Sequence, residues 1–239
     1  MSTCFIADLH LSGDEPEVVE RFIRFLTEEA VHHQALYILG DLFEVWLGDD
    51  LSLPEQTLIT EALQQTVAQG TAIYLQHGNR DFLIGDQFTQ ASGCTLIPDP
   101  YRIALNGEAI LITHGDQLCS DDLDYQRYRN WIRHPLTTWL LRHLPRPLRR
   151  RIGQSLRARS DQDKQQKSMA IMDVTQATVA STLQQWQLQQ IIHGHTHRPD
   201  IHHFTLNGAP ATRMVLGDWS TPSNNVLIYS DGIFMQQGW

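Results

Sequence analysis

Short apolar runs alternate with longer stretches of helical periodicity in the first third of the chain. The runs at 5–7, 35–39 and 72–75 are typical of short buried strands. Between them, apolar side chains recur three to four positions apart over 19–30 and 59–67, which predicts two amphipathic helices. This βαβαβ alternation predicts a largely parallel sheet with helices on its faces.

Turn signals and prolines dominate the middle of the chain. Asn106-Gly107 separates the apolar runs 101–105 and 109–112, which predicts a β-hairpin. From about 120 to 185 the strand pattern is absent, and we expect helices that are divided by the prolines of this segment.

Further strands are expected near the C-terminus. Apolar runs at 190–192, 214–216 and 226–229 follow the helical segment, and Asn207-Gly208 marks a second hairpin turn. We expect the antiparallel strands of this half to form a second sheet that packs against the first.

The composition is that of an ordinary globular protein. Of the 239 residues, 41% are hydrophobic and 19% charged, which suits one large domain or a domain with an insertion. The formal net charge of −9 argues against a nucleic-acid partner. Three distant cysteines, the lack of an export signal and the lack of a long apolar stretch lead us to expect reduced thiols and a cytoplasmic location.

The charge is unevenly distributed. Twelve of the 18 Lys and Arg residues fall within 127–167, which holds only two acids and therefore carries +10. The rest of the chain then carries −19, since the total is −9. We therefore expect this basic segment to bind anions.

Metal-ligating residue types follow the predicted strands. Two carboxylates, one amide and four imidazoles form this set: Asp8, His10, Asp41, Asn79, His114, His195 and His197. In parallel sheets the ligand site lies beyond the carboxyl ends of the strands. A nitrogen and oxygen set without thiolates suits Mn, Fe, Co or Zn, and seven groups fit two bridged ions better than one. Taken alone, the histidine-rich stretch 193–197 is equally consistent with a solvated surface loop.

The order of these motifs resembles the calcineurin-like metallophosphoesterase family. The resemblance implies a four-layer α/β/β/α sandwich, with two metal ions at the strand ends that catalyse phosphate-ester hydrolysis. It assigns Asp8, His10, Asp41 and His197 to one ion, and Asp41 (bridging), Asn79, His114 and His195 to the other.

One position departs from the general family pattern. Most members have a histidine after the Gly-Asn pair, where it protonates the leaving alkoxide, whereas this chain has Arg80. Arginine does not donate a proton at neutral pH, but it binds phosphate oxygens as a fork. A phosphate leaving group has a second pKa of about 6 and departs without a proton, so Arg80 favours a pyrophosphate bond as the target.

Three longer runs, 40–46, 78–85 and 114–122, resemble one subfamily, the UDP-2,3-diacylglucosamine pyrophosphohydrolases of lipid A biosynthesis. This likeness implies two Mn²⁺ ions, attack of hydroxide on the α-phosphate, and release of UMP and 2,3-diacylglucosamine 1-phosphate (lipid X). It implies catalytic roles for Asp41, Asn79, Arg80 and His195. The substrate contacts that it implies are Asn79, Arg80, Asp122, Arg157, Ser160, Lys164, Lys167 and His195.

Several of these residues have simpler interpretations. Asp122 and Ser160 also suit helix N-termini. Asp81 and Asp116 suit a supporting role, as carboxylates that hold His114 or Arg80 in orientation without binding the metal themselves. Gly217-Asp218-Trp219 mimics a motif but follows the last ligand, and we assign it no chemistry. His193 is expected to be structural.

The segment 121–170 is expected to be a helical lid inserted into a single domain that spans 1–239. Its basic residues are interleaved with apolar ones: Trp131, Ile132, Leu136, Trp139, Leu140, Leu144, Leu148 and Ile152. A cationic and apolar surface suits acyl chains, and it suits peripheral binding to the anionic cytoplasmic face of the inner membrane. The alternative is a helical hairpin with its own small core and a solvated basic face.

Two other functions compete with this interpretation. One is a different phosphoesterase of the same family, acting on cyclic nucleotides, phosphoproteins or dinucleotide polyphosphates, and the basic apolar segment argues against it. The other is a binding scaffold that has lost its metals, and the presence of all seven ligand types argues against that. The sequence leaves the oligomeric state undetermined.

Overall fold

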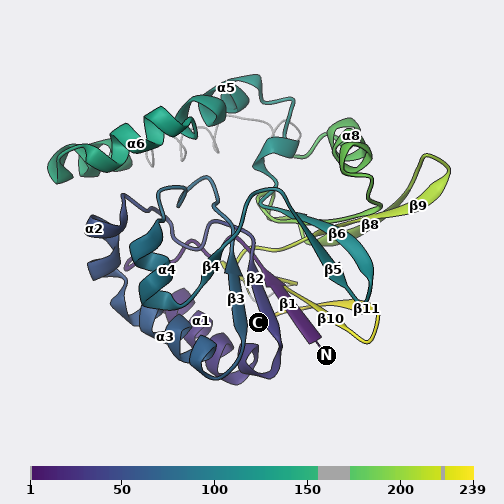
Figure 1. Cartoon of the computed structure of the whole chain (residues 1–239), viewed down its shortest axis with the longest axis horizontal. Coiled ribbons are helices and arrows are strands. Elements are labelled where there is room, and N and C mark those ends of the chain that lie inside the picture. The colour runs from purple at the N-terminus through teal and green to yellow at the C-terminus, as the bar shows by residue number, and fades with distance from the viewer. Residues whose placement is uncertain (1, 156–172, 222–223) are drawn as a thin grey trace.

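Two β-sheets lie face to face in the computed structural model, which describes residues 2–155, 173–221 and 224–239 (Figure 1). The first sheet has the strand order β11-β10-β1-β2-β3-β4. Its parallel strands are β1 (Ser2–Ile6), β2 (Ala35–Ile38), β3 (Ala72–Leu75) and β4 (Thr95–Leu96). β10 (Val226–Ser230) pairs antiparallel with β1, and β11 (Ile233–Gln237) pairs antiparallel with β10.

The second sheet has the order β5-β6-β7-β9-β8. Its central strands β6 (Glu108–Thr113), β7 (Gln190–His193) and β9 (Ala209–Val215) are parallel. β5 (Tyr101–Leu105) and β8 (Asp200–Leu206) pair antiparallel at the two edges. Both hairpins predicted from the Asn-Gly turns are confirmed, since they join β5 to β6 and β8 to β9.

Alternating side chains of each inner strand are buried in two different cores. In β1 and just beyond it, Cys4 and Ile6 face one core while Phe5 and Ala7 face another. Successive side chains of a strand point to opposite faces, so a strand covered on both faces is apolar throughout. This is why the short apolar runs of the sequence predicted strands correctly.

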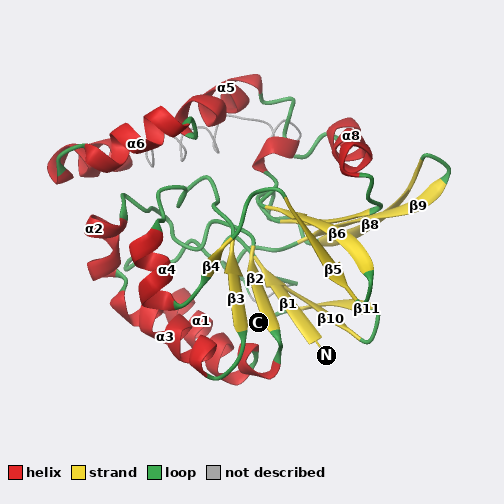
Figure 2. Ribbon diagram, viewed as in Figure 1, coloured by secondary structure: helices red, strands yellow, loops and turns green. Residues whose placement is uncertain are grey.

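Helices cover the outer face of each sheet, which gives the expected α/β/β/α layers (Figure 2). The helices α1 (Pro16–Glu28), α3 (Thr57–Ala68) and α4 (Asp86–Ser92) cover the first sheet, and α8 (Gln176–Trp186) covers the second. Short helical turns are α2 (Asp49–Ser52) and the 3₁₀ turns Ala30–His32, Leu53–Glu55 and Asp116–Leu118. The predicted fold class is therefore confirmed.

Residues 123–155, which follow β6, form helices that lie above the strand ends (Figure 1). They are α5 (Leu123–Ile132), α6 (Pro135–His143) and a helix over 146–155. We call residues 123–155 the helical cover. Pro135 begins α6, as expected for a residue that fixes the first helical turn. No helix in the described part of the chain is long and apolar enough to cross a membrane.

The prediction for the last strands is partly wrong. We expected the run at 226–229 in the second sheet, but it forms β10 and extends the first sheet beside β1, with Cys4 opposite Ile228. The run at 214–216 does lie in the second sheet, where β9 is parallel to β7 and antiparallel only to β8. Strand pairing is a long-range contact, and the local apolar pattern of a strand does not specify its partner.

Candidate metal centre

The loops after five strands bring the seven candidate ligands together. His10 Nε2 lies 3.4 Å from His197 Nε2, and Asp8 Oδ1 lies 3.5 Å from that same atom. On the other side, His114 Nε2 lies 2.9 Å from Asn79 Oδ1. The rings of His114 and His195 are 5.0 Å apart between centroids.

Asp41 stands between these two groups. Its Oδ2 lies 3.9 Å from His10 Nε2 and 3.8 Å from His114 Nε2. Two sets of three side chains converge closely enough to hold a cation: Asp8, His10 and His197, and Asp8, Asp41 and His114. The geometry thus gives Asp8 to both sets, whereas the family resemblance gives Asp41 the bridging place.

The donor set fits a divalent cation. The Asp8 side chain is fully buried, yet its Oδ1 has no well-formed hydrogen bond to any described residue. A buried carboxylate oxygen without a hydrogen bond is costly unless a positive charge faces it. With imidazole nitrogens and carboxylate oxygens around it and no thiolate, the cluster suits a first-row divalent metal.

Backbone strain is concentrated at these ligands. Asp8, His10, Asp41, His195 and His197 all have positive φ, between 51° and 69°. Residues with a Cβ rarely adopt this conformation, and its cost is tolerated where the surrounding structure fixes the backbone for function. These five residues, in the turns after β1, β2 and β7, therefore aim their side chains at one point instead of continuing the strands.

Two glycines allow the loops to approach one another. A Cβ on Gly78 would lie 2.1 Å from the backbone nitrogen of Asp41, and a Cβ on Gly194 would lie 2.4 Å from Asp8 Oδ2. No side chain fits at either position. The Gly-Asn and Gly-His pairs of the sequence are therefore explained by close packing at the strand ends.

Three ligand histidines have partners on the nitrogen that faces away from the cluster. His114 Nδ1 donates to the carbonyl of Leu39 at 2.9 Å, so that Nε2 is the ring nitrogen that faces the cluster. His197 Nδ1 lies 3.2 Å from Asp218 Oδ2, and His10 Nδ1 lies 3.1 Å from Glu44 Oε2. Such partners fix the ring orientation and tautomer of a metal-ligating histidine.

Sequence reasoning missed Asp218 and Glu44. We assigned no chemistry to Gly217-Asp218-Trp219, and Glu44 was only one residue within a longer matching run. Asp218 follows β9 and reaches His197, which follows β7, so only the pairing of these strands brings them together. The sequence did contain a signal for Asp218, because this carboxylate closely follows the apolar run at 214–216, as Asp8 and Asp41 follow theirs.

The histidines of the cluster differ in their proton affinity. Burial by itself lowers the pKa of His197, but the carboxylates of Asp8 and Asp218 outweigh it and raise that pKa to about 10. Burial and the nearby His114 lower the pKa of His195 to about 4. A cation bound by His197 therefore competes with a proton, whereas His195 is already neutral.

Asp81 and Asp116 do not have the partners that we expected. Asp81 accepts hydrogen bonds from the backbone nitrogens of Gly78 and Leu42, at 2.8 Å each, and so ties the loop after β3 to the loop after β2. Asp116 Oδ2 faces the helical cover, where it accepts a 2.9 Å hydrogen bond from Tyr125. Both carboxylates are fully buried.

Some of the expected substrate contacts lie in the described part of the chain and others lie outside it. Arg80 lies at the site, where its Nη1 donates to Glu44 Oε1 at 3.0 Å and its backbone nitrogen donates to Asp41 Oδ1 at 2.8 Å. Asp122 accepts from the backbone nitrogen of Tyr125 at 3.1 Å and thereby caps α5. Four further residues lie outside the described part of the chain: Arg157, Ser160, Lys164 and Lys167.

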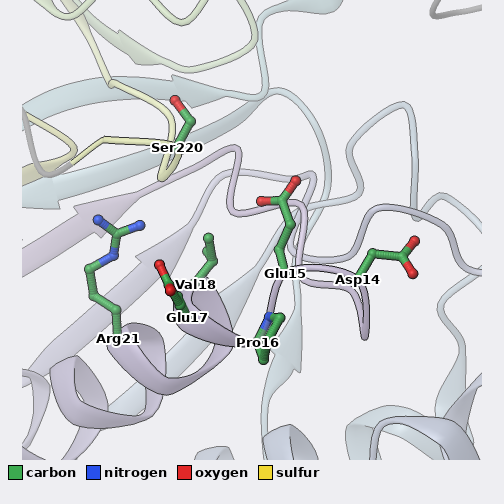
Figure 3. Close-up of a pocket in the computed structure, with 7 residues that line it drawn as sticks. All are labelled: Asp14, Glu15, Pro16, Glu17, Val18, Arg21 and Ser220. Atoms are coloured by element: carbon green, nitrogen blue, oxygen red, sulfur yellow. The ribbon is translucent and has the colours of Figure 1, made fainter.

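A separate hollow of about 660 Å³ lies at the start of α1 (Figure 3). Its lining consists of Asp14, Glu15, Pro16, Glu17, Val18, Arg21 and Ser220. The lining carries three acidic side chains and one arginine, which disfavours a phosphate ligand. The strand-end cluster is therefore the better candidate for phosphate chemistry.

Comparison with known proteins identifies the family of this chain. The model of the calcineurin-like phosphoesterase family matches residues 1–199. The UDP-2,3-diacylglucosamine hydrolase of Edwardsiella ictaluri (strain 93-146) is 48% identical over 236 residues, which cover 98% of this chain and 91% of that protein. The enzyme of the same description from Pseudomonas aeruginosa (strain UCBPP-PA14) is 48% identical over 219 residues, covering 92% and 91%.

Proposed function

Because the chain belongs to the calcineurin-like phosphoesterase family, we propose that it hydrolyses the pyrophosphate bond of UDP-2,3-diacylglucosamine in lipid A biosynthesis. The observation that carries this proposal is the convergence of carboxylates and imidazoles at the strand ends, in a chain 48% identical to hydrolases of this substrate. The products are UMP and 2,3-diacylglucosamine 1-phosphate.

The proposed cofactor is a pair of Mn²⁺ ions. Asp8, His10, Asp41 and His197 would hold one ion, and Asp41, Asn79, His114 and His195 would hold the other. When bound, such ions polarise phosphoryl oxygens and lower the pKa of a water, so that hydroxide is available near neutral pH. The side chains supply a rigid set of donors, since five of these residues are fixed in strained backbone conformations.

Arg80 is proposed to bind and stabilise the phosphate oxygens. Its side chain is 9% exposed and pairs with Glu44, which lies beside His10 as well. Glu44 thus orients the guanidinium next to the ligand cluster, and the arginine exchanges part of this pairing for the substrate phosphate. Asn79 and His195 both lie beside His114, and we assign them to the transferred phosphoryl group together with Asp41.

The remaining substrate contacts are proposed in the segment 121–170, which includes the helical cover. Asp122, Arg157, Ser160, Lys164 and Lys167 would bind the nucleotide, the sugar or the phosphates. We propose that 121–170 is a lid on a single domain spanning 1–239, and that its apolar residues bind acyl chains. The exposed ones support this role: Leu123, Trp131, Leu136, Trp139, Leu140 and Leu148.

The same surface is proposed to bind the anionic cytoplasmic face of the inner membrane peripherally. Exposed tryptophans beside arginines are typical of side chains that lie at the boundary of headgroups and acyl chains. Trp139 is 59% exposed, and Arg146 is exposed on the next helix. A water-soluble nucleotide substrate would give no reason for this surface.

The test is cleavage of UDP-2,3-diacylglucosamine by the purified chain in the presence of Mn²⁺. We expect Asp41→Ala and His195→Ala to lose at least 100-fold in kcat, on the order of the loss when one transition-state-stabilising group is removed. His203→Ala, which changes an exposed histidine of β8, serves as the matched control and retains activity. Near-normal cleavage by the Asp41 or His195 variants would refute the assignment.

Hydrolysis in ¹⁸O-labelled water tests the point of attack. Attack on the α-phosphate places the label in UMP. Label in 2,3-diacylglucosamine 1-phosphate would mean that the β-phosphate is attacked, and it would overturn the proposed orientation of the substrate.

A further inference from the structure

Most described arginines of the helical cover pair with acids of the body beneath it. Arg129 and Arg133 pair with Asp99 and Asp116, and Arg149 pairs with Asp50. The sequence predicted that this basic segment binds anions, and the structure shows that part of its charge is already matched by carboxylates of the chain itself.

The first cluster joins α5 to the ends of the second sheet, and we call it the α5 anchor. Asp116 Oδ2 lies 2.8 Å from Arg129 Nε and 3.1 Å from Arg133 Nη2. Asp99 Oδ2 lies 3.7 Å from Arg129 Nη2 and 3.6 Å from Arg133 Nη1. Asp99 also accepts a hydrogen bond from the backbone nitrogen of His114 at 3.0 Å, so the anchor rests on the same loop as a candidate metal ligand.

Both acids of the α5 anchor are buried, with side-chain exposures of 4% and 0%, while the two arginines are 14% and 18% exposed. The two carboxylates face the two guanidinium groups with little exposure to solvent, so these contacts are shielded from solvent ions and depend strongly on geometry.

Tyr125 connects the α5 anchor to the metal centre. Its hydroxyl donates to Asp116 Oδ2 at 2.9 Å, and its ring stacks on His195 with centroids 5.9 Å apart. Tyr125 lies one helical turn before Arg129, so the same face of α5 carries both contacts.

The second cluster joins the helix over 146–155 to the loop after β2, and we call it the α2 anchor. Arg149, which is 5% exposed, donates to both carboxylate oxygens of Asp50 at 2.7 and 2.6 Å and to the carbonyl of Leu47 at 2.7 Å. Arg146 donates to the same carboxylate at 3.1 Å. A Cβ on Gly153 would lie 2.6 Å from Leu47, so this helix lies directly against the loop.

Apolar burial contributes little to holding the cover between these anchors. Among its described helices, α6 has no buried residue and α5 has only Ile132. Leu141 packs against the core of the first sheet while only partly buried. Trp131, Leu136 and Trp139 are instead exposed. Polar contacts, among them the ion pairs of the two anchors, therefore hold the cover against the body.

We propose that the α5 anchor and the α2 anchor hold the helical cover at a fixed position above the strand ends, and that this position determines how the diacylated substrate binds. The inference rests on the proposed function. Arg129, Arg133 and Arg149 are positioning residues in this arrangement, since they act through the helices that carry them and through Tyr125. Because polar contacts attach the cover to the body, the exposed apolar side chains of the cover are available to bind acyl chains.

The first test compares two substrates in the Mn²⁺-loaded enzyme. One is UDP-2,3-diacylglucosamine, and the other is bis(p-nitrophenyl) phosphate, a small soluble diester that needs no acyl-chain site. For the double variant Arg129→Gln, Arg133→Gln and for Asp50→Asn, we expect KM for the lipid substrate to rise at least 10-fold. We expect kcat for the diester to stay within twofold of the parent enzyme.

Arg127→Gln is the matched control, because Arg127 lies on the same helix but is 79% exposed and pairs only locally with Asp124. It should change neither parameter. The conservative variant Arg129→Lys, Arg133→Lys should recover part of the KM, since it restores the charges but not the forked geometry.

Parallel losses on both substrates would overturn the proposal, because they would mean that the anchors maintain the metal centre. An unchanged KM for the lipid substrate would overturn it as well.

Amide hydrogen exchange gives a readout without substrate. Exchange in α5 should be at least 10-fold faster in the double glutamine variant, while β1 and β7 remain as protected as in the parent. If the parent enzyme cleaves the diester but not UDP-2,3-diacylglucosamine, the proposed function fails, and unaltered exchange in α5 would then reject the anchors separately.

Discussion

Two of the ligand histidines, His197 and His10, each have one carboxylate near the ring nitrogen that faces away from the cluster. Asp218 holds Nδ1 of His197 at 3.2 Å, and Glu44 holds Nδ1 of His10 at 3.1 Å, while the Nε2 atoms of the two rings point toward each other. A ligand histidine without such a partner has more rotamers and a less basic nitrogen. The affinity for a cation therefore depends on residues that do not touch it.

Asp218→Asn tests this at the scale of one residue. We expect Mn²⁺ to bind about 10- to 100-fold more weakly, the usual effect of losing such a partner. Binding is measured by titrating the metal-free protein with Mn²⁺ in a calorimeter. Asp231→Asn, in the exposed turn between β10 and β11, is the control and should bind normally. Unchanged affinity in Asp218→Asn would show that the loop alone orients His197.

Strands and turns act as units that deliver these side chains. β1, β2, β3, β6 and β7 end at the same side of the sandwich, and each is followed by a turn that carries ligand types. The turns touch because Gly78 and Gly194 leave room for the neighbouring loops. The close approach of the loops after β1 and β7 is therefore a property of two elements together.

Gly194→Ala tests the close approach of these elements. The new methyl group would meet Asp8 Oδ2 at 2.4 Å and the Cβ of Ala7 at 2.5 Å. Overpacking of a buried contact costs about 1–3 kcal/mol, so the free energy of unfolding should fall by about 2 kcal/mol, together with activity. Urea denaturation measures the change. Gly13→Ala, where nothing lies within 4 Å of the new methyl group, should leave both unchanged.

In the whole molecule, the residues of the hydrophobic cores are distinct from the candidate metal ligands. Three hydrophobic cores lie between the four layers, and none of the seven candidate ligands belongs to them. The acidic body carries a cationic helical cover whose ends are ion-paired to it and whose middle exposes tryptophans and leucines. We therefore expect the fold to be stable without metal.

Removal of metal with EDTA should abolish hydrolysis and leave the circular dichroism spectrum unchanged, because the cores do not include the ligands. Activity should return when Mn²⁺ is added after the chelator has been removed by dialysis. Loss of the folded spectrum in the metal-free protein would contradict this separation, and it would make the metal a structural element.

Trp131→Ala, Trp139→Ala tests the membrane surface of the whole molecule. We expect at least 10-fold weaker binding to vesicles that contain phosphatidylglycerol, since two exposed aromatic side chains that would enter the interface are lost. Co-sedimentation with vesicles measures this. Leu58→Ala is the control, because Leu58 is 62% exposed but lies on α3, away from the cover. Equal binding of all variants would argue against this surface.

The sequence allowed more of the site to be predicted than of the strand order. Asp8, Asp41 and His114 could be found because each follows an apolar run and is flanked by its own local motif. β10 was placed in the wrong sheet, since an apolar run buried on both faces fits an inner strand of either sheet. Asp218 was assigned no chemistry because it follows the last ligand in the chain, and nothing near it in the sequence relates it to His197.

Local sequence features predict the chemistry of the site: the nitrogen and oxygen donors, their place after buried strands, and Arg80 where most family members have a histidine. These features are local, since a residue type and its distance from a strand end are written along the chain. Tertiary structure decided which carboxylate supports which histidine, and that arginines such as Arg129 and Arg149 pair with the body. The strength of a charge interaction depends on separation in space and on burial, and neither follows from separation in sequence.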